Sequence, residues 1–235
     1  MRKFLVLLLL VCFFTSILSA EDELPSSRRP TTKSAGRVVA ASKVLAEIQG
    51  APDQRIPEEV LGSAECVAVV PSLLNGGFVF GGRYGKGVAS CRTKQGWSAP
   101  AFFTIGGGSF GLQIGGQASD LVMLIMNKGG MDSLLSSKFK LGADASAAAG
   151  PVGRHAAADT DWKLRAQVLT YSRSRGLFAG LELGGAVIKQ DISSTREFYG
   201  RIVPFSNSLM GEVEPPKGSY PFLSTLAKWA QQAAK

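Results

Sequence analysis

Glycine is concentrated in the middle of this 235-residue chain, and this limits what the middle can fold into. Between Gly76 and Gly116 there are 13 glycines in 41 residues, separated by short β-branched and aromatic runs. Glycine at this density disfavours regular helix and favours turns, bulges and close approach of backbones. The runs between the glycines are therefore expected to be strands of a sheet.

Helical patterns lie on both sides of this glycine-rich region. From Arg37 to Ile48 apolar residues recur at spacings of three and four, which predicts an amphipathic helix. Between residues 163 and 190 two apolar runs meet near Arg175 and Gly176, which predicts a hairpin. We expect an α+β fold with a glycine-rich antiparallel sheet, curled or closed into part of a barrel, flanked by N-terminal and C-terminal helices. Further helices are expected at 57–61, 131–138, 194–199 and 220–234.

The beginning of the chain has the pattern of a secretory signal peptide. Residues 1–20 have a basic start, an apolar run and a small-residue end. The run is shorter than the roughly 20 apolar residues of a membrane span, so an uncleaved anchor is the less favoured alternative. Cleavage near Ala20 would make the protein periplasmic or secreted. Residues 21–35 predict a flexible arm, residues 36–203 the main domain, and residues 204–235 a C-terminal extension with a terminal helix.

Two cysteines, Cys66 and Cys91, follow the signal segment. In an oxidising compartment paired cysteines tend to form a disulfide. The alternative is two buried thiols that pack as small apolar side chains. With one histidine, His155, the chain cannot by itself build a metal site from several imidazoles or from four thiolates.

One short motif matches a catalytic pattern. Residues 107–111 read G-x-S-x-G, and Asp144 and His155 follow in the order found in α/β-hydrolases. The motif works on a strand-to-helix turn, yet the residues after Ser109 have no helical period. A serine hydrolase is therefore a distant alternative. The overlapping G-x-G-x-x-G at 106–111 is disfavoured as a dinucleotide site for the same reason.

Two intervals of the chain contain no acidic residue. They run from Cys66 to Ser119 and from Trp162 to Leu181, and both contain lysines and arginines. This favours a cation-biased surface over an acid–base site. In the second interval strand alternation would place Arg173 on a basic face suited to phosphates, with an ordinary solvated face as the alternative. Nucleic acid is not an expected partner, because no recognition helix is evident.

Several separated blocks, taken together, resemble one protein family. They occur in order between about Val38 and Arg201. The chain resembles the SYLF domain family, and the resemblance implies a non-enzymatic lipid-binding module. Similar eukaryotic domains bind phosphoinositides, fungal relatives also bind and regulate actin, and exported bacterial members look like phospholipid binders of the envelope. The blocks include Gly82-Arg83-Tyr84-Gly85, Gly150-Pro151-Val152-Gly153-Arg154 and Ser172-Arg173-Ser174-Arg175-Gly176-Leu177-Phe178.

On this basis we expect an exported phospholipid-binding protein with no cofactor, no metal and no catalytic residue. The expected partner is anionic phospholipid or a membrane surface, and no actin role is expected for an exported chain. A structural or protein-interaction module of the cell envelope is the alternative. The apolar helix residues could also simply pack against the sheet. The expected head-group residues are Arg37, Lys43, Arg154, Arg173 and Arg175, and the expected acyl-chain contacts are Val38, Val39, Leu45 and Ile48.

Overall fold

The structure is a computed structural model of the chain, and the residues that it describes lie within the unit Thr32–Lys235. The predicted signal peptide and most of the predicted arm lie outside the described residues. The structure describes residues 32–51, 55–77, 80–110, 115–152, 166–174, 177–180 and 183–232.

Helix α2 (Lys33–Gln49) is the expected amphipathic helix, and it begins earlier than its apolar period indicates. The Thr32 side chain caps it by accepting a hydrogen bond from the N–H of Ala35 at 3.2 Å. Glu197, far away in sequence, accepts another from the N–H of Ser34 at 2.9 Å. These acceptors satisfy N–H groups that the first turn of a helix leaves free. The last residues of the predicted arm therefore belong to the helix, which corrects the expected boundary.

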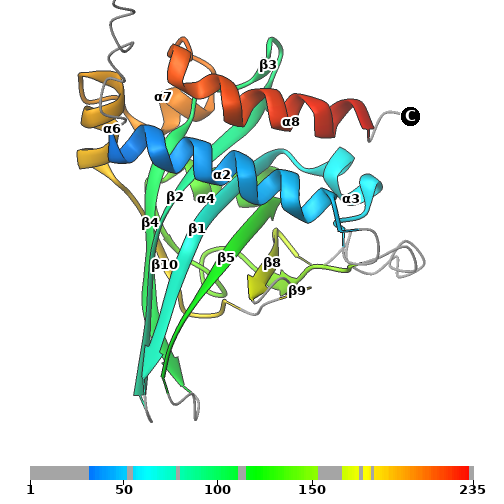
Figure 1. The fold of residues 1–235 in the computed structure, drawn as a ribbon. Coiled ribbons are helices and arrows are strands. Elements are labelled where there is room, and N and C mark those ends of the chain that lie inside the picture. The colour runs from blue at the N-terminus through cyan, green and yellow to red at the C-terminus, as the bar shows by residue number, and fades with distance from the viewer. Residues whose placement is uncertain are drawn as a thin grey trace, which may run out of the picture. The chain divides into compact units, whose positions relative to one another are not determined.

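The glycine-rich middle belongs to a sheet that, within the described residues, has ten strands. Its order is β6-β10-β4-β2-β1-β5-β8-β7, with β3 paired to β2 and β9 paired to β8. Among these described strands β7 and β8 are parallel and the other pairs are antiparallel. The sheet curls into half a barrel and helices from both ends pack on it, which confirms the predicted α+β class (Figure 1). The strands are β1 (Cys66–Gly77), β2 (Phe80–Thr93), β3 (Gly96–Trp97), β4 (Ala101–Phe110), β5 (Gly115–Ile125), β6 (Lys138–Lys140), β7 (Ala147–Ala149), β8 (Val168–Ser174), β9 (Leu177–Gly180) and β10 (Val187–Gln190).

The predicted hairpin is present, but it is shorter than expected. Strands β8 and β9 pair antiparallel, and the residues of the expected turn, Arg175 and Gly176, lie outside the described residues. The apolar run does not continue the hairpin, because β10 pairs with β4 and β6 instead. A turn at Gly184 and Gly185, the latter with a φ of 82°, redirects the chain before β10.

The C-terminal residues expected as an extension contribute to the core. Phe222, Leu226 and Trp229 of α8 pack in the same apolar cluster as the buried face of α2. Their spacing of four and three residues places them on one side of the helix. The helices beyond α2 are α3 (Glu58–Ser63), α4 (Lys128–Leu135), α6 (Ile192–Tyr199), α7 (Phe205–Leu209), a 3-10 helix at Lys217–Ser219, and α8 (Tyr220–Gln232).

Each face of the sheet is packed by different elements. Helices α2 and α8 lie side by side across one face, near one end, and β1, β2, β4 and β5 run on beyond them (Figure 1). Successive residues of a strand serve opposite faces. Val67 and Val69 of β1 therefore pack with α2 and α8, whereas Ala68 and Val70 pack with residues of α4, α7 and β6 on the second face.

Two glycines of β2 allow the second face to pack tightly. A Cβ at Gly85 would lie 2.5 Å from Cγ1 of Val70, and a Cβ at Gly87 would lie 2.4 Å from Cζ of Phe103. These distances are too short for any side chain to be accommodated without movement. Apolar side chains of the curled sheet thus pack directly on glycine backbone.

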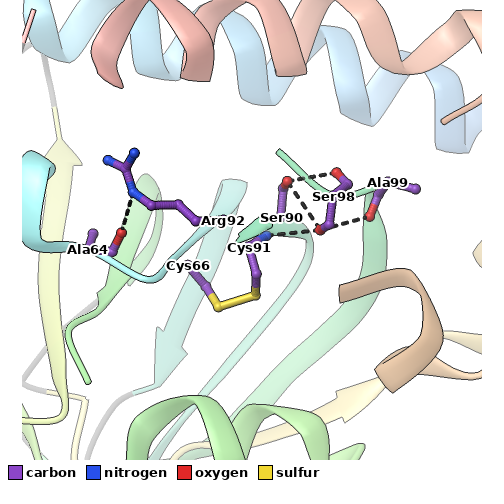
Figure 2. Close-up of a disulfide and its surroundings, with 7 residues drawn as sticks. All are labelled: Ala64, Cys66, Ser90, Cys91, Arg92, Ser98 and Ala99. Carbon is purple, nitrogen blue, oxygen red and sulfur yellow. Dashed lines mark hydrogen bonds between the residues drawn. A yellow bond between two sulfur atoms is a disulfide. The ribbon is translucent and has the colours of Figure 1, made fainter. Parts of the chain in front are cut away.

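Cys66 and Cys91 are directly opposite in the register of β1 and β2. They form a disulfide with an S–S distance of 2.04 Å, so the bonded alternative is the one present (Figure 2). Beside it, Nε of Arg92 donates to the carbonyl of Ala64 at 2.8 Å (Figure 2). The bond joins the ends of two strands next to the chain that enters from α3.

Candidate interaction surface

The end of the sheet that α2 and α8 leave uncovered carries two exposed apolar side chains. Leu74 of β1 and Tyr84 of β2 are directly opposite in the antiparallel register. Leu74 is 56% exposed and Tyr84 is 51% exposed. Every second residue of a strand lies on the same face of the sheet. Tyr84 therefore lies on the same face as Val88, which packs in the cluster formed with α2 and α8. Adjacent exposed apolar side chains of this size are typical of interaction sites.

A bulge in β1 determines where this exposed end begins. Ser72 has a φ of 60°, and the pairing of β1 with β2 shifts between Val69 and Leu74. The N–H of Ser72 donates to Oδ1 of Asp120 at 3.1 Å. The bulge inverts the alternation of the strand, so that Leu73 is buried on the second face and Leu74 lies on the helix side.

A groove of about 360 Å³ separates the N-terminal half of α2 from β1 and β2. Leu74 and Tyr84 contribute apolar surface to this groove, and Lys33, Arg37 and Lys86 contribute positive charge. The groove therefore places the exposed apolar pair beside three cations, Lys33, Arg37 and Lys86, which we call the cationic wall.

The buried carboxylate of Asp191 pairs with two cations of this wall, Lys86 and Arg37. It caps α6 by accepting from the N–H of Ser194 at 3.1 Å, and it accepts from Oγ of the same residue at 2.7 Å. Nζ of Lys86 donates to it at 2.9 Å, and Nη1 of Arg37 lies 3.5 Å from its Oδ2. Asp191 thus ties α2, β2 and α6 together. Glu197 adds a second negative charge near Arg37, so the three cations and two carboxylates leave the wall with one net positive charge.

The charges of this network persist at neutral pH. Burial alone would raise the pKa of Asp191, but hydrogen bonds from Ser193, Lys86 and Ser194 outweigh it and hold that pKa well below its ordinary value. Burial lowers the pKa of Arg37, and the carboxylate of Asp191 opposes that shift. The carboxylate and the guanidinium therefore face each other as an ion pair.

Most of the expected acyl-chain contacts lie in the core. Val38, Leu45 and Ile48 are 0% exposed, whereas Val39 is 51% exposed. Exposing the three buried side chains would cost about 1.5–3 kcal/mol each, and the sum is comparable with the whole stability of a domain. In the described conformation they pack against the sheet, which corrects the expectation that they contact lipid.

The expected head-group cations are not assembled into one described patch. Arg37 lies in the N-terminal half of α2, whereas Arg173 of β8 forms an ion pair with Glu47 near the other end of that helix. Arg37 and Glu47 are about 15 Å apart along the helix axis at 1.5 Å per residue. Lys43 is exposed and lies 3.9 Å from Glu47. Two further expected cations, Arg154 and Arg175, lie outside the described residues.

The backbone does not support the serine-hydrolase alternative. Ser109 lies within β4 and pairs in register with Gly81, so there is no strand-to-helix turn at this serine. Asp144 accepts from the N–H of Lys140 at 2.7 Å in an exposed turn, and His155 lies outside the described residues. Within the described ranges no group of three or more His, Cys, Asp or Glu residues could hold a metal ion. No helix in the same ranges is long and apolar enough to cross a membrane.

Several residues of this surface and its support were not among the site residues expected from the sequence. Tyr84 belongs to the Gly-Arg-Tyr-Gly block, and a large residue between glycines on a strand has few neighbours to cover it. Asp191 precedes Ile-Ser-Ser, which is a recognisable N-cap pattern. Alternation could not find Leu74, because the bulge inverts the phase. Lys86 becomes meaningful only through its contact with Asp191.

Comparison with known proteins gives a consistent assignment. Residues 106–229 match the family described as "Ysc84: Las17-binding protein actin regulator". The chain is 33% identical to LAS seventeen-binding protein 3 of Saccharomyces cerevisiae, over 89% of this chain and 46% of that protein. It is 31% identical to SH3 domain-containing YSC84-like protein 1 of Rattus norvegicus, over 83% of this chain and 57% of that protein. The chain spans about half the length of the curated relatives it matches.

These names correct the expected partners. The predicted signal peptide and the likeness to exported members favoured phospholipid as the partner and no actin role. The relatives instead carry names of Las17-binding or SH3 domain-containing proteins, and the family description names an actin regulator. The expectation of lipid without a protein or actin-pathway partner is therefore wrong. The family match over more than half of the chain, with relatives above 30% identity over most of it, shows that this protein belongs to the Ysc84 family, the SYLF domain family that its sequence blocks resemble.

Proposed function

We propose that this chain is a protein-binding regulatory module of the Ysc84 family and that it contacts its partner through the uncovered end of the sheet. We call this site the sheet-end surface and define it by Leu74, Tyr84, Lys33 and Lys86. The observation that carries the proposal is the exposure of Leu74 and Tyr84 as a cross-strand pair. The names of the relatives support a protein partner.

The charges of the sheet-end surface favour an acidic partner. Three cations line the groove beside Leu74 and Tyr84, and the carboxylates of Asp191 and Glu197 balance two of the three positive charges. An acidic protein segment with an apolar side chain matches this arrangement. Because both side chains are already about half buried, covering the rest contributes about 1.5–3 kcal/mol before the costs of association, so the apolar pair alone gives weak binding and the affinity also depends on charge pairing. The cationic wall makes that binding sensitive to salt.

Actin filaments and purified Las17 are the probes for this proposal, because the family and its relatives are named for them. Co-sedimentation with filaments and biolayer interferometry with Las17 would be measured at low and high salt. We expect the wild type to bind at least one of the two proteins at low salt. The double variant Leu74→Ser with Tyr84→Ser should lose at least about tenfold in affinity, which corresponds to about 1.4 kcal/mol.

The matched control is Ile202→Ser with Tyr220→Ser, which removes two side chains that are 55% and 68% exposed elsewhere. Circular dichroism would establish that both double variants are folded. Equal binding by the two double variants would overturn the proposed surface. Absence of binding to either protein at low salt would overturn the proposed partner class, as would binding to anionic vesicles alone.

A non-enzymatic role is part of the same proposal. It is supported by relatives that are named as binding proteins and by the position of Ser109 inside a paired strand. We expect no hydrolysis of short p-nitrophenyl esters above the buffer rate. Ester turnover that Ser109→Ala abolishes would refute this part.

We also propose that residues 1–20 direct export and that the mature protein, starting near Glu21, is periplasmic or secreted. The apolar N-terminal run and the disulfide support this, since disulfides persist in oxidising compartments. The intact mass of the protein produced in cells should correspond to residues 21–235 with one disulfide. A mass that includes residues 1–20 would refute cleavage. The proposed sheet-end surface does not depend on the compartment.

A further inference from the structure

Three lysines of β6 and β10 lie close together on the sheet. Lys138 and Lys189 are directly opposite in the antiparallel register, and Lys140 follows two residues along β6. All three are exposed, and none of them forms an ion pair within the described ranges. We call these three residues the lysine cluster. Like charges directly opposite each other destabilise a sheet, so the stability of the fold does not explain this arrangement.

The lysine cluster lies on the same face of the sheet as the sheet-end surface. Phe139 and Ile188, the neighbours of the lysines along their strands, are buried in the apolar cluster of the second face. Neighbours along a strand lie on opposite faces, so the lysines lie on the face that α2 and α8 cover further along. The charges and the exposed pair of Leu74 and Tyr84 are therefore accessible from one side of the sheet.

Two rows of directly paired residues connect the lysine cluster to the sheet-end surface. Directly paired residues share a face, so each row runs across the sheet on one side. From β10 to β2 is two strand spacings, or about 10 Å, which a few residues of a partner can span. One row is Lys138, Lys189, Thr104 and Lys86, and the next is Lys140, Val187, Gly106, Tyr84 and Leu74.

The acidic groups beside these rows do not neutralise the cluster. The carboxylate of Asp191 pairs with Lys86 and Arg37. Oδ2 of Asp144 accepts from the backbone N–H of Lys140 at 2.7 Å, and this carboxylate forms no ion pair within the described ranges. Even if Asp144 is counted against the three lysines, a local excess of two positive charges remains. An acidic partner would therefore be attracted to the cluster.

Protection of the sheet edge does not account for the whole cluster. Lysines on an edge strand discourage pairing with other chains, and β6 is the outer strand of the described order. Lys189, however, lies on β10, which is covered by strands on both sides. The outward carbonyls of β6 are also already engaged: that of Lys140 accepts from the N–H of Asp144 at 2.8 Å, and that of Lys138 from Oγ of Ser136 at 3.0 Å. A partner would thus contact the lysine side chains and would not add a strand.

The spacing of the lysines selects the class of partner. A lysine ammonium is a compact charge without the fork of a guanidinium, and mutual repulsion keeps the three ammoniums apart. They therefore suit several separate single charges better than one compact multivalent group. Lys138 and Lys140 are two residues apart on a strand, or about 6.6 Å, which is also the spacing of alternate residues in an extended segment. We propose that the lysine cluster binds an extended acidic protein segment through its carboxylates.

The test is a titration of the full chain into a fluorescent peptide of alternating Glu and Ser at low salt. Exposed ion pairs contribute little singly, so all three lysines are changed together, and Lys138→Gln with Lys140→Gln and Lys189→Gln should lose at least about fivefold in affinity. The control, Lys94→Gln with Lys217→Gln and Lys228→Gln, removes the same charge from exposed lysines elsewhere and should stay within about twofold of the wild type. Equal losses in the two triple variants would overturn the site. Tighter binding of tripolyphosphate, or of vesicles of phosphatidylglycerol and phosphatidylcholine in equal parts, would overturn the class of partner.

This inference rests on the proposed function for the class of partner, and the two can fail separately. The peptide has no apolar side chain, so Leu74→Ser with Tyr84→Ser should bind it within about twofold of the wild type. Loss of peptide binding in that variant would overturn a separate lysine cluster. If the same variant binds actin filaments and Las17 like its control, the proposed surface is wrong and the lysine cluster stands on the peptide result.

Thermal unfolding of Lys189→Glu provides a second readout. This change places a carboxylate opposite Lys138, so it replaces a like-charge pair by a pair of opposite charges. The unfolding midpoint without peptide should rise, and the affinity for the acidic peptide should fall. A Lys189→Glu protein that unfolds at a lower temperature than the wild type and binds the peptide equally well would refute the site.

Discussion

The two ends of the β1–β2 pair present apolar cross-strand pairs in different surroundings. Near the disulfide, Val69 is opposite Val88 and both are buried in the cluster formed with α2 and α8. Beyond the bulge, Leu74 is opposite Tyr84 and both are exposed. The difference is one of coverage, because the helices reach only the first end (Figure 1). Apolar pairs at the covered end stabilise the fold, and the same chemistry at the uncovered end is available to a partner.

Charged groups follow the same division. At the edge of the covered end, Arg37 and Lys86 share the carboxylate of Asp191. At the uncovered end, the buried nitrogens of Arg83 have no partner within the described residues. Paired charges therefore hold the helices on the sheet at the covered end.

The largest effect should come from breaking the attachment of α2. Asp191→Ala removes the cap of α6 and leaves Arg37 as a buried cation without its carboxylate. We expect a loss of about 3–5 kcal/mol in the free energy of unfolding, measured by urea denaturation. Asp191→Asn keeps an N-cap residue and should lose less. A loss below about 1 kcal/mol for Asp191→Ala would show that Asp191 does not hold the covered end together.

Adjacent leucines of β1 offer a sharper comparison. Leu73 is buried on the second face, whereas Leu74 is exposed. Leu73→Ala should cost about 2–5 kcal/mol in the free energy of unfolding, because it leaves a cavity. Leu74→Ala should stay within about 0.5 kcal/mol of the wild type, as exposed substitutions usually do. Similar losses for the two variants in chemical denaturation would mean that Leu74 is covered in solution.

Two glycines of β2 distinguish the covered part of the sheet from its uncovered end. A Cβ at Gly87 would lie 2.6 Å from the carbonyl oxygen of Val69, whereas a Cβ at Gly82 would have nothing within 4 Å. We expect Gly87→Ala to lose about 1–3 kcal/mol through overpacking. Gly82→Ala should be neutral or gain up to about 1 kcal/mol from the stiffer unfolded chain. Differential scanning calorimetry would rank the two, and a Gly82→Ala protein that unfolds first would contradict the assignment of the open end.

The smallest expected effect is a pH dependence that separates wild type from Asp191→Asn. The pKa of Asp191 in the folded chain lies below its ordinary value of 3.8. Its charge therefore stabilises the fold above that ordinary value, and the contribution is lost as the pH falls towards the folded pKa. Urea midpoints from about pH 6 to about pH 3 should converge for the two proteins as the pH falls. Curves that stay parallel would show that the carboxylate is not preferentially stabilised in the fold.

Local patterns predicted much of the fold and little of the candidate site. The apolar period predicted α2, and the glycine-rich runs predicted a curled sheet, because both are repeats within a few neighbouring residues. The expected lipid contacts lie on the same helix and require its apolar face to be exposed. Periodicity shows that a helix has an apolar face, and it does not show what covers that face. In the fold this face is occupied by the sheet and by α8.

Composition, residue spacing and recognisable blocks were enough to predict the class of fold, the long N-terminal helix of the domain and the family. The packed chain was needed to show that Arg37 meets a carboxylate 154 residues away, that a bulge at Ser72 turns Leu74 outward, and that the helices stop short of the end of the sheet (Figure 1). Burial and pairing depend on contacts between segments that are far apart in the sequence. Such contacts depend on how the whole chain packs, and a local sequence pattern does not show them.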